Sequence, residues 1–325
     1  MFLMMASGLK SNFLTLNYWV LCMTIRKVVS RISLVAIAIT SQMAMAYDYN
    51  TKAKEATPFT KEANERVYQV LDFNDQQAFA DADRGFIAPL LNKGDITGVF
   101  SATAMNYVQG NKAPESVNPS LWRHAQLVNR GGLYKVSEHI YQVRGQDLSN
   151  LTIIETNEGM VFYDVEYSGK ALKASIELYE QHRGKRALKG VIISHSHADH
   201  FGGFGGIYEA GLATPEDVSS GKLPVLAPEG FVEEAVSENV MGGNIMARRA
   251  GYQYGNVLKV NEKGIVTSAL GPALANDASS LPIPNHFITK DNETVTIDGV
   301  DFVFYLVPHT EAPSEMVMFI PQWGA

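Results

Sequence analysis

Cysteine is almost absent from this sequence. The single cysteine among 325 residues is Cys22, and it lies in an amino-terminal segment that we expect to be removed from the mature chain. A mature chain without a thiol can form no disulfide and can offer no cysteine ligand to a metal. The cysteine content therefore fits a protein of the periplasm or the outside of a bacterium-like cell.

Basic residues are also in deficit. The chain has 27 Lys and Arg against 34 Asp and Glu, a formal net charge of −7. Removal of residues 1–46 would take away four basic residues and no acidic one, which brings the charge to −11. This balance disfavours nucleic acid as a partner, because neutralising phosphates needs a basic patch. An anionic substrate would have to be attracted locally, by a metal ion or by a few arginines.

Long hydrophobic runs are lacking as well. The apolar run at residues 32–40 is shorter than the roughly 20 residues that a transmembrane helix needs. A basic segment at residues 23–31 precedes it and a small-residue cleavage pattern at residues 44–46 follows it, which is the order of a secretory signal peptide. We expect residues 1–46 to be this signal peptide, with residues 1–22 as an over-extended start. The mature protein would then be periplasmic or secreted.

Residues 47–130 predict a helical amino-terminal arm. Helical spacing with strong helix formers at residues 60–71 and 73–91 predicts two helices. Residues 84–90 and 118–123 interrupt this pattern, and we expect them to pack as an arm or lid on the main domain.

Residues 131–325 predict a layered α/β domain. Short apolar or alternating runs separated by turns indicate strands, and longer stretches with helical spacing indicate helices. The predicted strands are residues 133–136, 140–143, 151–155, 160–164, 190–193 and 223–228, the predicted helices are residues 170–182 and 231–254, and residues 294–308 predict a hairpin with an Asp-Gly turn. A hairpin series, a helix and a buried strand in this order favour an α/β arrangement in layers.

Three of the eight histidines lie within six positions after the strand predicted at residues 190–193. The stretch contains His195, His197, Asp199 and His200 and continues into Phe-Gly-Gly. An extended segment points alternate side chains to opposite faces, so a turn into a helix is needed to direct all four to one place. Imidazole nitrogen with carboxylate oxygen suits Zn²⁺ first, with Mn²⁺ or Fe²⁺ as alternatives. The pattern therefore predicts a metal site, with His195 and His197 on one ion and Asp199 and His200 facing a second.

A catalytic metal site needs a third protein ligand, with water in the fourth position. His309, Glu311 and Glu315 follow the end of the predicted hairpin, as the first cluster follows its strand. Spacing alone leaves all three open as the further ligand.

Two other features each have a functional and a structural interpretation. Asp164 ends its strand, where it could accept a hydrogen bond from a ligand histidine or simply be a turn aspartate. The adjacent Arg248 and Arg249 could bind a sulfate or phosphate by paired hydrogen bonds, or belong to a solvated helix face.

The histidine cluster, its preceding strand and residues 160–164 resemble the metallo-β-lactamase superfamily. Further segments narrow the resemblance to the bacterial alkyl sulfatases, enzymes that release inorganic sulfate from alkyl sulfate esters such as dodecyl sulfate. These segments are residues 118–123, 142–150, 194–203, 237–240 and 310–316. They occur in the same order, and the resemblance covers the chain from about residue 60.

The resemblance implies an α/β fold of the metallo-β-lactamase type, an αββα sandwich, with two zinc ions. It places His195 and His197 on one zinc and Asp199 and His200 on the other, and it identifies Glu311, in Thr-Glu-Ala-Pro, as a further ligand. Asp199 is also the residue to which we assign a catalytic role. A homodimer is implied for full-length members.

Members of that family continue where this chain stops. They carry a further glutamate and histidine ligand, a helical dimerisation domain and a sterol-carrier-like domain. We therefore expect a sandwich truncated at its carboxyl-terminal side, an incomplete domain at residues 131–325 and an under-coordinated second metal. Residues 165–167, Val-Glu-Tyr, also depart from the proline-containing loop that is usual in the family.

The function implied is hydrolysis of linear alkyl sulfate esters to an alcohol and inorganic sulfate, with a small amphiphilic sulfate ester as the substrate. One alternative is another hydrolase of the same fold, a lactamase or thioesterase, which would have a histidine in the place of Glu311. Another alternative is an inactive truncated product.

Overall fold

The computed structural model describes residues 54–91, 106–255, 258–275 and 277–325, and all of them belong to the unit Asp48–Ala325. The expected signal peptide at residues 1–46 lies outside the described residues. Within the described ranges, no helix combines the length and the apolar character needed to cross a bilayer.

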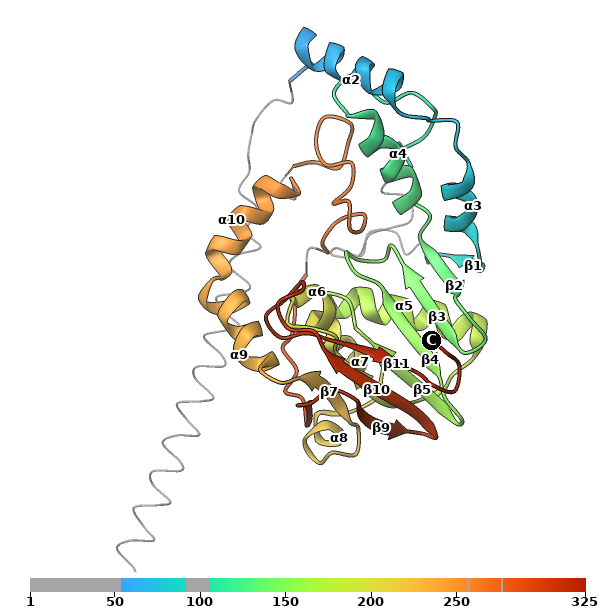
Figure 1. The fold of residues 1–325 in the computed structure, drawn as a ribbon, viewed down its shortest axis with the longest axis vertical. Helices are drawn as coiled ribbons and strands as arrows, with labels where there is room; N and C mark the ends of the chain where they lie inside the picture. Colours follow the sequence, from blue (N-terminus) through green and yellow to red (C-terminus); the bar gives the residue numbers. More distant parts are fainter. Residues whose placement is uncertain (1–53, 92–105, 256–257, 276) are drawn as a thin grey trace, which may run out of the picture. The chain divides into compact units, whose positions relative to one another are not determined.

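The amino-terminal arm is built from α2 (Pro58–Val70), α3 (Gln77–Asp83) and α4 (Pro119–Val128), as Figure 1 shows. The Thr57 and Asn118 side chains cap α2 and α4 by accepting hydrogen bonds from backbone N–H groups of the first turn, and a proline follows each cap.

The helix predicted over residues 73–91 is wrong beyond Asp83. Residues Phe86–Pro89 form strand β1, which pairs antiparallel with β2 (Gly132–Lys135). Pairing with a strand more than forty residues away outweighs local helical spacing here. Pro89, which has no N–H to donate, stands at the end of this edge strand.

The main sheet has eight strands, in the same order as the chain. After β1 and β2 come β3 (Ile140–Arg144), β4 (Leu151–Glu155), β5 (Gly159–Tyr163), β6 (Ala187–Ile192), β7 (Val225–Pro228) and β8 (His286–Ile288). Neighbours from β1 to β5 are antiparallel and neighbours from β5 to β8 are parallel. A second sheet has the order β11 (Met316–Phe319), β10 (Val300–Leu306), β9 (Glu293–Ile297).

Helix α5 (Gly169–Arg183) connects β5 to β6, and a chain of short helices follows β6. These are α6 (Ala198–Phe201), η1 (Gly202–Phe204), α7 (Gly205–Glu209) and α8 (Pro215–Ser219). The helix predicted over residues 231–254 is divided into α9 (Phe231–Val236), η2 (Ser237–Met241) and α10 (Gly243–Gln253). The middle piece, η2, is a π-helical turn.

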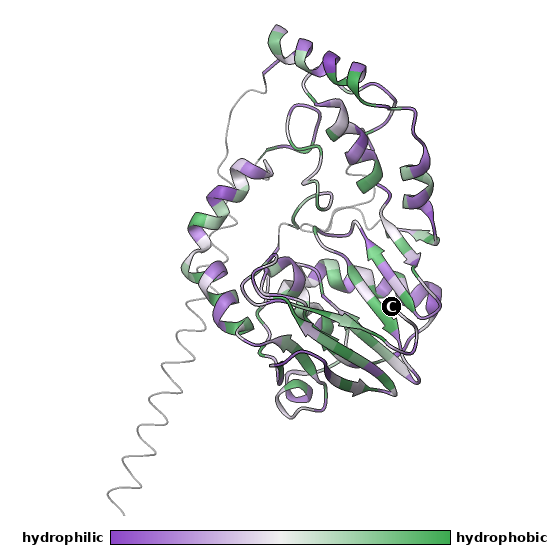
Figure 2. Ribbon diagram, in the orientation of Figure 1, coloured by the Kyte–Doolittle hydropathy of each residue, from purple (hydrophilic) through white to green (hydrophobic). Residues whose placement is uncertain are grey.

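Two cores lie on opposite faces of the main sheet, because successive residues of a strand point to opposite sides. Met160 and Phe162 of β5 pack in one core with Leu172 and Ile176 of α5. Val161, between them, packs in the other core with the buried apolar residues of β10. Figure 1 shows the three-stranded sheet in red across strands β3 to β5, and Figure 2 shows both sheets as largely hydrophobic. The predicted α/β arrangement in layers is confirmed.

Candidate metal centre

Strands β5 and β6 deliver the site residues to one edge of the main sheet. The two strands are parallel, so their carboxyl ends lie side by side, with Asp164 after β5 and His195 after β6. His197 is the last extended residue (φ −77°, ψ 140°), and α6 begins at Ala198. The turn from strand to helix that the four-residue pattern requires is therefore present, with Asp199 and His200 in the first turn of α6.

Asp164 orients two of the histidines. Its backbone is left-handed (φ 56°), and its buried carboxylate accepts hydrogen bonds of 2.8 Å from Ser194 N, Ser194 Oγ and His200 Nδ1. The Ser194 hydroxyl lies 2.8 Å from His195 Nδ1 and so connects that ring to the same carboxylate. The interpretation of Asp164 as an acceptor that orients ligand histidines fits this geometry better than that of a simple turn residue.

Glu311 comes from the second sheet, in the loop between β10 and β11. Glu315 holds this loop, since its Oε2 accepts hydrogen bonds from Thr310 Oγ1 (2.6 Å), Glu311 N (2.7 Å) and Ala312 N (3.0 Å). Glu315 also forms an isolated β-bridge with His195, and Met316 N donates to Ser194 O at 2.9 Å. These contacts bring the loop beside the histidine cluster.

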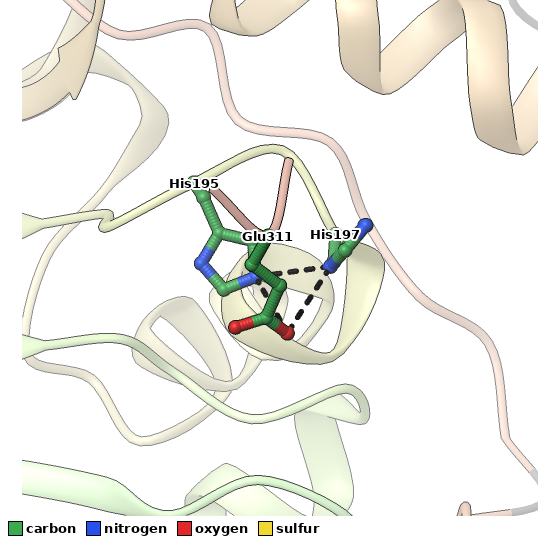
Figure 3. Close-up of side chains that lie close together, drawn as sticks. All are labelled: His195, His197 and Glu311. Atoms are coloured by element: carbon green, nitrogen blue, oxygen red, sulfur yellow. Dashed lines mark hydrogen bonds and ion pairs between the residues drawn. The ribbon is translucent and has the colours of Figure 1, made fainter. Parts of the chain in front are cut away.

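Three potential ligand atoms converge from His195, His197 and Glu311, all within 4.8 Å of one another (Figure 3). His195 Nε2 lies 3.1 Å from His197 Nδ1, and Glu311 Oε1 lies 3.8 Å and 3.6 Å from these two nitrogens. Ligands bound tetrahedrally to Zn²⁺ at about 2.0–2.1 Å lie about 3.3 Å apart. The spacing and the N, N, O donor set therefore fit one zinc ion without a large movement.

Asp199 and His200 lie next to this group. Asp199 Oδ2 is 3.5 Å from His200 Nε2, and the His200 and His195 rings are 4.0 Å apart between centroids. Among the residues that the structure describes, His195, His197 and Glu311 form the one group of three potential metal ligands. The assignment of Asp199 and His200 to a second ion stays a prediction, as does the catalytic role of Asp199.

The pKa values of His195 and His200 are shifted in opposite directions. Burial, with the neighbouring positive charge of His200, lowers the pKa of His195, although Asp164 opposes this. A neutral ring is the form that binds a metal. Burial also disfavours the charged form of His200, but the charge of Asp164 and its hydrogen bond outweigh burial and raise the pKa of His200 to about 9.

The loop before β4 contacts α6 through a hydrogen bond. Ser149 Oγ donates to the carbonyl oxygen of Asp199. Asp147 is fully buried and accepts backbone hydrogen bonds from Leu148, Ser168 and Ala275. Burial raises the pKa of Asp147 to about 6 against the effect of these hydrogen bonds. Polarity alone did not distinguish these residues in the sequence, because aspartate and serine are ordinary loop residues.

Glycines allow the chain after β5 to lie directly against the helix region after β6. A Cβ at Gly203 would lie 2.0 Å from the carbonyl oxygen of Val165. Val165 N donates to His200 O and Gly203 N donates to Glu166 O, both at 2.9 Å. The Phe-Gly-Gly that ends the motif is thus required for close packing of backbone on backbone.

The other candidates are placed elsewhere. His309 has a left-handed backbone (φ 66°) and an exposed side chain, and it is not in the ligand group. Arg248 and Arg249 are exposed on α10, and the sulfate-binding role considered for them stays untested. Glu238 of η2 lies in one of the segments that carry the resemblance, residues 237–240, but no sequence pattern assigned it a role; its Oε2 lies 3.6 Å from His197 Nε2.

Comparisons with known proteins identify the family of the chain. Residues 144–321 match the model of the metallo-beta-lactamase superfamily. The chain is 41% identical over 277 residues to a linear primary-alkylsulfatase of Pseudomonas sp., covering 83% of this chain and 40% of that protein. It is 41% identical over 275 residues to an alkyl/aryl-sulfatase of Saccharomyces cerevisiae, covering 83% and 42%.

Among solved structures, the chain is similar to a stereoselective inverting sec-alkylsulfatase from Pseudomonas sp. The TM-score is 0.77 at 41% identity, over 83% of this chain and 43% of that one. The chain thus spans about two fifths of the length of these relatives. The predicted fold and the predicted resemblance to alkyl sulfatases are confirmed.

Proposed function

This chain belongs to the metallo-β-lactamase superfamily, and from that premise we propose that it is part of a zinc-dependent alkyl sulfatase. The reaction proposed is hydrolysis of linear alkyl sulfate esters to an alcohol and inorganic sulfate. Similarity to alkylsulfatases supports the class of reaction. The preference for linear esters, the two zinc ions and the activity of the whole protein are part of the proposal.

The observation that carries the proposal is the identity of the third ligand. A lactamase or thioesterase of this fold would be expected to place a histidine beside the first two histidines, whereas Glu311 Oε1 lies 3.6 Å from His197 Nδ1 here. Its neighbour His309, the available histidine in the same loop, is exposed and outside the group. The donor set thus favours the sulfatase over the other hydrolases.

The chemistry divides between the ions and the chain. When bound, two divalent ions would activate water near neutral pH and neutralise the charge of the sulfate ester. His195, His197 and Glu311 would hold one ion, and Asp199 with His200 would contribute to holding the second. As its catalytic role, the Asp199 carboxylate would accept a hydrogen bond from the attacking water and orient it. If water attacks carbon, sulfate leaves as a good leaving group and no strong acid is needed from the protein; attack at sulfur would instead release the alcohol oxygen, which must take up a proton.

The substrate proposed is a small amphiphilic sulfate ester. Exposed apolar side chains of η2 and α10, among them Val240, Met241 and Ile245, begin two residues after Glu238, which contacts His197. They would pack on the alkyl chain, and each buried methylene would contribute about 0.8 kcal/mol. The value of kcat/KM should therefore rise with the length of the alkyl group among linear esters.

A sulfate-release assay tests the proposal. Dodecyl sulfate is incubated with zinc and either this chain or a version extended to the length of its relatives, with a β-lactam and a thioester as comparison substrates. Sulfate release by the extended version supports the proposal, and turnover of only the lactam or thioester refutes it. Activity in the extended version alone would assign this chain to the inactive truncated class, and a zinc content below one per chain would agree with that result.

The proposal includes a periplasmic or secreted location and, for the full-length protein, a homodimer. The location depends on the expected signal peptide at residues 1–46. Fractionation of cells that express the tagged chain tests the location, and a cytoplasmic product of unreduced length would contradict it. Light scattering of the extended version tests the dimer.

A further inference from the structure

The side of His197 turned away from the other ligands faces a carboxylate. His197 Nδ1 points to the ligand group, 3.1 Å from His195 Nε2 and 3.6 Å from Glu311 Oε1. Its Nε2 lies 3.6 Å from Glu238 Oε2. Both side chains are about one quarter exposed, so this contact is partly shielded from water.

His197 needs a different tautomer from its two neighbours. A neutral imidazole has one N–H and one lone pair. His195 and His200 have Nδ1 against Ser194 and Asp164, which leaves their Nε2 atoms for a metal. His197 presents Nδ1 to the ligand group, so its proton must be on Nε2. An acceptor on the Nε2 side would favour this tautomer and so hold the ring in the ligating form.

The potential acceptor belongs to a π-helical turn. Glu238 lies in η2, where Gly242 N donates to Ser237 O at 2.8 Å across five residues. A π-turn inserts one residue into a helix and so rotates the following side chains by about 100° relative to a continuous α-helix. Asn239 holds the turn by donating from Nδ2 to Ala235 O at 2.9 Å. Turns of this kind are rare within α-helices and occur frequently at functional sites.

From these contacts we infer that Glu238 is a positioning residue: its carboxylate lies 3.6 Å from His197 Nε2, and when a metal binds it closes to hydrogen-bond distance, accepts a hydrogen bond from the Nε2–H group and fixes His197 as an Nδ1 ligand. The inference rests on the proposed metal site, since it concerns a residue behind one of the ligands. Carboxylates behind ligand histidines fix the tautomer and the ring orientation, and their loss weakens metal affinity about 10- to 100-fold.

The first test measures zinc affinity by competition with a chromophoric chelator on the full chain. Glu238→Ala should bind zinc 10- to 100-fold more weakly than the unmodified chain, by analogy with other such carboxylates. Glu238→Gln should restore part of the affinity, because its amide oxygen can still accept the proton. Glu233→Ala is the matched control, an exposed glutamate in the preceding helix α9, and its affinity should not change. Circular dichroism of the metal-free variants checks that each is folded.

The second test needs no substitution. Long-range ¹H–¹⁵N spectra of the zinc-loaded chain should show His197 with a protonated Nε2 and a bound Nδ1, and the opposite tautomer would overturn the inference. Equal zinc affinity of Glu238→Ala and the unmodified chain would overturn it as well. If the unmodified chain binds no zinc at all, the proposed metal site itself fails, which separates the two failures.

Discussion

Glu311 and Glu315 lie four residues apart in one loop, yet the structure gives them different tasks, and exchanging each for alanine should separate metal binding from folding. Glu311 offers a potential ligand atom from a side chain that is 61% exposed. Glu315 contributes the three hydrogen bonds that shape the loop. Spacing in the sequence could not choose between them.

The expected magnitudes follow from these contacts. Glu311→Ala removes an exposed side chain, so the free energy of unfolding of the metal-free chain should change by no more than about 0.5 kcal/mol. Glu315→Ala removes an ionised acceptor of three hydrogen bonds, each worth about 1.5 kcal/mol or more when made to a charged group. Because water can replace part of these bonds at an exposed loop, we expect a loss of about 2–4 kcal/mol.

The two alanine variants should rank in the opposite order when zinc affinity is measured instead of stability. Loss of a direct ligand at Glu311 should weaken zinc binding by more than the 10- to 100-fold typical of a residue behind a ligand, and the loss at Glu315 should fall within that range. Glu315→Gln is the matched control, because its amide oxygen can accept the same three hydrogen bonds. It should recover most of the stability.

The measurements are urea unfolding of the metal-free chain and zinc titration of the folded chain, both near pH 7. Hydrogen bonds lower the pKa of Glu315 against the effect of burial, so its stabilising effect should be present above pH 4.5 and be lost only in stronger acid. If Glu311→Ala proved to be the unstable variant, or if Glu315→Ala alone abolished zinc binding, the assignment of ligand and support would be reversed and the reasoning refuted.

Three further substitutions, with Gly243→Ala as a control, test the surroundings of the site. Burial and the charge of a nearby aspartate raise the pKa of Glu166 well above its usual range, so the chain should lose stability as pH rises above about 4.5, and Glu166→Gln should flatten this dependence in urea unfolding. Gly203→Ala should destabilise the chain by about 3 kcal/mol, because its Cβ would meet the Val165 carbonyl. Gly243→Ala, with open space around its Cβ, should be neutral or gain up to about 1 kcal/mol from helix propensity, and equal losses in the two variants would contradict the close-packing argument. Ser194→Ala removes the hydroxyl between two site residues and should weaken zinc binding about tenfold; unchanged affinity in calorimetric titration would show that this hydroxyl is not needed.

Much of the main domain could be predicted from sequence because each of these strands is marked by the residues of its own short segment. The run predicted at residues 151–155 is strand β4 with the same bounds, and residues 160–164 differ from β5 by one residue at each end. Short apolar runs between clear turns leave little choice of structure. The histidine cluster was predictable for the same reason, since all four residues belong to one short segment.

The elements that were missed depend on distant partners. Strand β1 forms only because β2 provides its hydrogen bonds, and β8 and β11 are short strands that become strands by joining a sheet edge. Glu238 lies in a segment that carries the resemblance, but no spacing in the sequence connects it with His197, and only the fold brings the two side chains together. Among His309, Glu311 and Glu315, only the fold of the loop shows which side chain reaches the histidines.

The position of the candidate metal centre has a consequence for the architecture of the chain. His195 leaves the main sheet and Glu311 leaves the second sheet, more than a hundred residues further along, so an ion held by both would close a loop of that length. In a chain with one cysteine, such an ion would link two distant segments that no disulfide within the chain can link. Unlike a disulfide, the ion would leave the unfolded chain unconstrained, so its stabilisation would follow from its affinity: about 2.7 kcal/mol at a free zinc concentration 100 times Kd. A chelator should therefore lower the free energy of unfolding and loosen the loop that carries Glu311 from the histidine cluster.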